Sequence, residues 1–154
     1  MAISRGAGTE IIRTAMFADV DGGQKLIIGA QHHIYTVLSI IVFCNSLNAT
    51  TDTCLFRMVG WDNHAGASAA EPVLCKANPQ ANETWVWNDK FSFNGYEGTT
   101  HSGQFGAGDD AADLAYTNYI ADQGGSAIQS LEVSPTHADD DYDIFITFID
   151  QNNA

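Results

Sequence analysis

The stretch that decides the fold is HIYTVLSIIVFCN, residues 33–45. Read with a period of two, it places two sets of mostly apolar side chains on opposite faces: Ile34, Thr36, Leu38, Ile40, Val42 and Cys44 on one, and Tyr35, Val37, Ser39, Ile41 and Phe43 on the other. This alternation indicates a β-strand. A strand that is apolar on both faces is either central and covered or lies against a neighbouring subunit.

Eight further short segments alternate in the same way and are separated by turn residues. They cover residues 10–17, 25–28, 53–61, 71–76, 84–88, 90–93, 127–133 and 142–149. We expect residues 53–61 to form a hairpin with 33–44, and 127–133 to pair with 142–149. The pattern predicts an all-β protein, an antiparallel β-sandwich of the jelly-roll or immunoglobulin-like type.

One domain over residues 1–154 is the expected organisation, because about 100 to 200 residues build one hydrophobic core. Residues 1–10 show no core pattern, and we expect an N-terminal arm or a frayed end there. Residues 95–125 form a long insertion that holds seven of the 14 glycines. We expect an interaction loop in this segment; a plain surface loop and disorder are the alternatives.

The chain is strongly acidic, with 19 Asp and Glu against six Lys and Arg and a formal net charge of −13. Residues 78–154 hold 13 of the acidic residues and only Lys90 as a basic one. This balance excludes a nucleic-acid binder and a protein that binds anionic membranes, because phosphates would be repelled. The acidic half either docks on a basic surface or a cation, or forms a solvated face that keeps the protein soluble.

No segment has the pattern of a secretory signal or a membrane span. Residues 1–10 lack an apolar region, and the apolar stretch 34–44 is too short to cross a bilayer. We therefore expect synthesis in the cytoplasm. Cys44, Cys54 and Cys75 lie in apolar runs, which predicts small buried hydrophobic residues rather than disulfides or zinc ligands.

The sequence predicts neither an enzyme nor a cofactor. Its five histidines come without a nucleophile elbow, a zinc-protease motif, a phosphate loop or dinucleotide glycines. Segment 19–23 begins like an EF-hand loop, but Gly23 stands at the third ligand position, which excludes that motif. Four carboxylates lie together just before the last strand, those of Asp139, Asp140, Asp141 and Asp143. They form either a weak candidate calcium site or a hydrated acidic turn.

Aromatic side chains near turns and in the insertion are the remaining interaction candidates. They are Trp61, Tyr96, Phe105, Tyr116 and Tyr119. Flat rings can stack on sugar faces, so a glycan-binding module is the alternative from another functional class. Trp85 and Trp87 share one face of a strand, so we expect at least one of them in the core.

Three runs of the chain together resemble small β-sandwich structural proteins of tailed bacteriophages: residues 33–45, TCLFRMV at 53–59 and NETWVWNDKFSFNG at 82–95. In that group a T-I-x-S-I-x-V-x-N run opens the sandwich and a hairpin strand follows. An x-W-x-x-K-x-x-L-x-x-G segment then precedes closing strands with aliphatic alternation, as at 144–149. The resemblance covers residues 26–95 and 126–150. The insertion at 95–125 departs from it, because a short glycine-aspartate turn usually stands there.

The resemblance implies a virion component, most specifically a capsid cement or decoration protein that assembles as a trimer outside the capsid and bridges its subunits. Its partners would be further copies of this chain and the major capsid protein of the same phage. It would be made in the host cytoplasm and reside in the virion, with no nucleic acid, membrane or cofactor. A tail or neck accessory protein with a glycan- or receptor-binding role is the alternative.

Overall fold

The computed structural model describes residues 6, 8–60, 73–95 and 128–152, and these residues form nine β-strands and no helix. Branched and aromatic residues, which suit a pleated surface, dominate the strands. The strands are β1 (Glu10–Val20), β2 (Gln24–Ile28), β3 (His33–Ser46), β4 (Cys54–Val59), β5 (Val73–Ala77), β6 (Thr84–Trp87), β7 (Phe91–Asn94), β8 (Ser130–Pro135) and β9 (Asp141–Asn152). In this part of the chain, no helix is long and apolar enough to cross a membrane.

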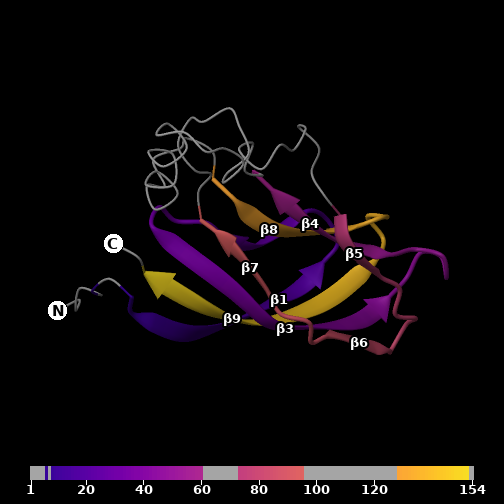
Figure 1. The fold of residues 1–154 in the computed structure, drawn as a ribbon. Helices are drawn as coiled ribbons and strands as arrows, with labels where there is room; N and C mark the ends of the chain where they lie inside the picture. The colour runs from indigo at the N-terminus through magenta and orange to yellow at the C-terminus, as the bar shows by residue number, and fades with distance from the viewer. Residues whose placement is uncertain (1–5, 7, 61–72, 96–127, 153–154) are drawn as a thin grey trace, which may run out of the picture.

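The strands form two antiparallel sheets with the core between them (Figure 1). The five-stranded sheet has the order β1-β9-β3-β6, with β7 also paired to β3, and the four-stranded sheet has the order β2-β8-β4-β5. The pairs are nested: β1 pairs with β9, β2 with β8, β3 with β6 and β7, and β4 with β5. Nested pairs folded into two sheets are the jelly-roll arrangement. The predicted all-β sandwich is confirmed, and its strand order is that of a jelly roll rather than of an immunoglobulin domain.

Two predicted strand pairs are wrong, because each joins strands of different sheets. Residues 47–53 carry the chain from β3 in one sheet across to β4 in the other, so these strands do not form a hairpin. Residues 136–140 likewise lead from β8 to β9 in the opposite sheet. Strands that follow each other in the chain then face each other across the core, where both bury their apolar sides.

The core follows the alternation of the strands. In β9 the inward side chains are all buried, as the period of two predicts; they are Tyr142, Ile144, Ile146 and Phe148. Cys44 and Cys54 are fully buried, Cys75 is half-buried, and all three thiols are free. The prediction that the cysteines are small hydrophobic residues and not disulfides is confirmed.

Strand β3 departs from strict alternation at a β-bulge between Val37 and Ser39. Tyr35 and Val37 are buried before the bulge, whereas Ile40, Val42 and Cys44 are buried after it. The prediction that placed these two groups on opposite faces is wrong, because the extra residue at a bulge moves every following side chain to the other face. The strand is central in its sheet, with β9 on one side and β6 and β7 on the other.

Backbone hydrogen bonds join the ends of β2, β7 and β8. The N–H of Gly29 donates to the carbonyl of Gln129 at 2.9 Å, and the N–H of Gln129 donates to the carbonyl of Gly95 at 2.9 Å. A Cβ on Gly29 would lie 2.0 Å from the oxygen of Gly95, so the two backbones meet this closely only with glycine. Gly95 and Gln129, which stand on either side of the undescribed residues 96–127, are therefore in direct contact; the predicted insertion at 95–125 lies outside the described residues except for Gly95.

The two ends of the described chain also meet. The N–H of Gly8 donates to the carbonyl of Asn152, and the N–H of Asn152 donates to the carbonyl of Thr9 at 3.0 Å. These bonds continue the β1–β9 ladder into the predicted arm at 1–10, of which residues 1–5 and 7 lie outside the described part.

Candidate functional site

The outer face of the five-stranded sheet points away from the core, and its side chains form rows that cross the strands. One row is apolar and runs through successive register partners on β1, β9, β3 and β6, namely Met16, Phe145, Ile41 and Val86. Met16 is 65% exposed, Val86 48% and Phe145 39%. Beside Phe43 the row borders a shallow cavity of about 240 Å³. We call these four residues the apolar row.

On one side of the apolar row the next two rows are uncharged as well, whereas the row on its other side holds Asp143 beside Phe43. The first consists of the hydroxyl side chains of Thr14, Thr147 and Ser39. The second consists of Ile12, Ile149, Thr36 and Ser92. In a chain with a net charge of −13, these three rows form an uncharged area, where another acidic protein meets less like-charge repulsion than elsewhere on the surface.

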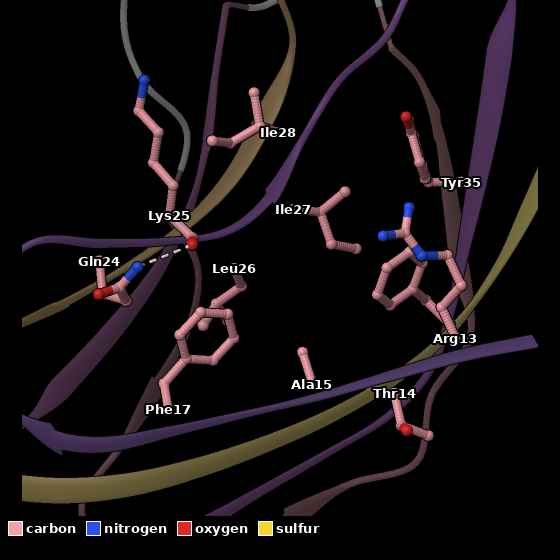
Figure 2. A pocket seen from close by; sticks show the side chains of 11 residues that line it. Arg13, Thr14, Ala15, Phe17, Gln24, Lys25, Leu26, Ile27, Ile28 and Tyr35 are labelled. Carbon is pink, nitrogen blue, oxygen red and sulfur yellow. Dashed lines mark hydrogen bonds between the residues drawn. The ribbon is translucent and has the colours of Figure 1, made fainter.

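A groove of about 450 Å³ opens between β1 and β2, on the side where both sheets end (Figure 2). Ala15 and Phe17 line it from β1, and Leu26 and Ile27 line it from β2. Two basic residues, Arg13 and Lys25, complete the rim, and none of the lining residues is acidic.

A buried carboxylate at the groove holds two basic side chains. Asp150 Oδ2 accepts a hydrogen bond from Arg13 at 3.3 Å, and Asp150 Oδ1 lies 2.6 Å from His33 Nδ1. The Asp150 side chain is only 4% exposed, so these contacts compensate a charge that is removed from water. A carboxylate orients histidine in many catalytic sites. Here the described residues give the His33 side chain no second hydrogen bond and no nucleophile, so the group ties β1, β3 and β9 together.

The four carboxylates of the weak calcium candidate are divided by the fold. Asp140 is fully buried and accepts hydrogen bonds from the backbone N–H groups of Asn48 at 3.0 Å and His137 at 3.2 Å. Asp139 is exposed beside His137. Asp140 therefore joins the loop that contains Asn48 to the loop that contains His137, and it does not form one cation site with Asp139.

Asp141 and Asp143 lie with Asp19 instead, and one carboxylate oxygen of each is within 4.8 Å of the others. Asp19 belongs to the segment rejected as an EF-hand, and the pairing of β1 with β9 brings it here. Asp143 accepts a hydrogen bond from the backbone N–H of Asp19 at 3.1 Å, and Asp141 accepts one from the amide of Asn45 at 3.3 Å. Hydrogen bonds already account for two of the three carboxylates, and calcium binding stays a prediction.

The thiols are not suited to nucleophilic attack. Burial raises the pKa of Cys54 to about 12, with smaller contributions from Cys75 and Asp140. Burial also raises the pKa of Cys75 to about 12. The pKa of Cys44 is raised by burial first and by Asp140 second. All three thiols are therefore protonated at neutral pH, where a nucleophile has to be a thiolate.

The predicted aromatic interaction residues lie outside the described part of the chain, namely Trp61, Tyr96, Phe105, Tyr116 and Tyr119. Trp85 and Trp87 are half-buried and pack against the core. The ring of Trp85 stacks on Phe56 with 5.9 Å between ring centres. We expected at least one of these tryptophans to be buried, but both are only half-buried at the margin of the core, and neither forms a flat exposed platform for a sugar.

Sequence reasoning missed the apolar row as a set of residues. The two-sided pattern of residues 33–45 was its signal, since it required a neighbour or a cover on the second face. Met16 and Val86 gave no such signal, because only the strand register places them beside Ile41 and Phe145.

No known protein family matches this chain, and no curated protein is similar to it.

Proposed function

We propose that this protein is a non-enzymatic structural component of a phage particle, most specifically a capsid cement protein that binds outside the capsid and bridges its subunits. It works by adhesion, through the outer face of its five-stranded sheet. The observation that carries the proposal is the apolar row, with two uncharged rows on one side of it, on a sheet face that no described segment covers. The assignment to a phage particle rests on the resemblance of three sequence runs to phage β-sandwich proteins.

The size of this face fits a stable protein contact. Four strands about 4.8 Å apart and the 12 residues of β9 at about 3.3 Å each give a face of about 19 by 40 Å, or about 760 Å². A standard interface takes about 800 Å² from each partner. One sheet face is therefore enough for a specific contact with another subunit.

The jelly-roll topology and the charge distribution agree with this role. Jelly rolls occur in viral capsid proteins, and also in lectins and cupins, so the fold supports the proposal by analogy alone. The uncharged rows suit contacts between copies of an acidic chain, such as the proposed trimer. The acidic remainder suits a basic patch on the major capsid protein. Repetition over a shell makes individually weak contacts strong together.

Binding to capsid shells assembled without the protein tests the proposal. The purified chain is mixed with shells of the phage that encodes it, and co-sedimentation and the temperature of shell opening are measured. The proposal expects saturable binding and a higher opening temperature. Light scattering is expected to give the mass of three 16.6 kDa chains before binding. A chain that does not bind the shells, at any ratio, refutes the cement function.

Two valine substitutions locate the binding surface. Val86 lies in the apolar row and is 48% exposed, whereas Val73 lies on β5 of the other sheet and is 45% exposed. Val86→Asp is expected to weaken binding to the capsid shells at least tenfold, because the contact would bury the new carboxylate without a partner. Val73→Asp makes the same chemical change at the same exposure and is expected to bind like the unchanged protein. Equal binding by both variants refutes the outer face as the contact surface.

A further inference from the structure

The side of the sandwich formed by β1 and β2 is open at both sheet edges. In the described part of the chain β1 pairs only with β9, and β2 pairs only with β8. β1 has 11 residues and no proline, and its register is regular from Glu10 to Phe17. Every second residue of such an edge points its N–H and C=O groups away from the sheet, where another strand can pair with them.

The groove between these edges offers an apolar wall next to the free backbone groups. Side chains of Phe17 and Ala15 on β1 and of Ile27 on β2 point into the same space (Figure 2). A strand laid along β1 would place every second side chain against this wall and the others in water. The groove volume of about 450 Å³ has room for several such side chains.

The residues that line the groove include basic side chains and no acidic ones, although the molecule is acidic. Two of the six basic residues, Arg13 and Lys25, line it in a chain that carries 19 acidic residues. Arg13 keeps 54% of its side chain exposed although it also contacts Asp150. Lys25 is exposed and makes no ion pair among the described residues. A carboxylate of a ligand can therefore contact these basic side chains here, whereas the acidic surface elsewhere repels it.

We propose that an extended peptide segment with carboxylate side chains, from another protein, binds in this groove as an added strand on the free edge of β1. Main-chain hydrogen bonds to β1 give the affinity, as in other cases of strand addition. Alternate apolar side chains contact Phe17 and Ile27, and the carboxylates meet Arg13 and Lys25. This site is distinct from the outer face and does not depend on the cement function.

Fluorescence anisotropy with the full chain tests the site. The probe is a labelled eight-residue peptide in which valine alternates with glutamate and threonine. Three comparison ligands separate the contributions: the same peptide with lysine for glutamate, the same peptide with alternate amides N-methylated, and decanoate as a small anionic apolar molecule. The acidic peptide is expected to bind, and its affinity to fall as salt is added. The lysine and N-methylated peptides are expected to bind at least tenfold more weakly.

Charge-reversal variants show whether the groove is the binding site. Lys25→Glu is expected to weaken the binding of the acidic peptide at least fivefold. Thermal melting checks that this substitution of an exposed residue leaves the fold intact. Lys90→Glu, in the turn between β6 and β7, makes the same change of net charge and is expected to bind like the unchanged protein. Equal effects of the two variants, or equal binding of the N-methylated peptide, overturn the proposal. Binding of decanoate but not of the peptide also overturns it, in favour of a small-molecule site.

Discussion

Replacing Asp140 tests the loop contact that the structure assigns to this buried carboxylate. Asp140 is fully buried, and its two oxygens accept the backbone N–H groups of Asn48 and His137. These bonds connect the loop after β3 to the loop before β9. A hydrogen bond to a charged group contributes about 1.5–3 kcal/mol. The two donors belong to exposed residues and can find water in part, so Asp140→Ala is expected to lower the free energy of unfolding by about 2–4 kcal/mol.

Urea unfolding, followed by tryptophan fluorescence, measures this change. Asp140→Asn keeps one acceptor oxygen and presents an amide to the second donor, so about half of the loss is expected. Asp139→Ala is the matched control, because its neighbouring carboxylate is 78% exposed and a change within about 0.5 kcal/mol is expected. An Asp140→Ala protein within 1 kcal/mol of the unchanged one would refute the reasoning, as would a loss that appears only when calcium is present.

Three further substitutions or titrations examine the core and the glycine contact. Phe56→Ala removes a fully buried ring that stacks on Trp85, and a loss of about 3–5 kcal/mol in urea unfolding is expected; a loss under 1 kcal/mol would contradict the assigned packing. The pKa of Cys54 is raised from 9.0 to about 12, so its protonated form stabilises the fold fully below pH 9 and this contribution is lost as the pH rises toward 12; Cys54→Ala is expected to show a smaller alkaline loss of stability. Gly95→Ala places a Cβ 2.0 Å from a backbone oxygen and is expected to lower the melting temperature by several degrees, whereas Gly22→Ala, with open space around it, is expected to leave it unchanged.

Features that depend on one strand at a time were accessible to sequence reasoning. The inward side chains of β9 follow from alternation alone, and so does the shared face of Trp85 and Trp87. The turn residues between the segments marked the strand ends. The alternation and the turn residues together were sufficient to predict an all-β sandwich.

Features that depend on neighbouring strands were not accessible. The bulge after Val37 has no local signature in the alternation, and it reversed the assignment of the following side chains. The hairpin expected between β3 and β4 relied on chain proximity, whereas apolar burial sends the second strand to the other sheet. The apolar row joins residues as distant as Met16 and Phe145, so no window of sequence contains it.

The nested pairing has a consequence for the order in which the protein is made. Arg13 on β1 and Asp150 on β9 are 137 positions apart, and the ladder between these strands closes only when β9 has emerged from the ribosome. At about 5–20 residues per second, the first strand waits roughly 7–27 s for its partner. During this time Ile11, Ile12 and Met16 have no sheet to join, which exposes a segment prone to pair with other nascent chains. Emergence of β9, which pairs with both β1 and β3, is thus the event that completes the five-stranded sheet.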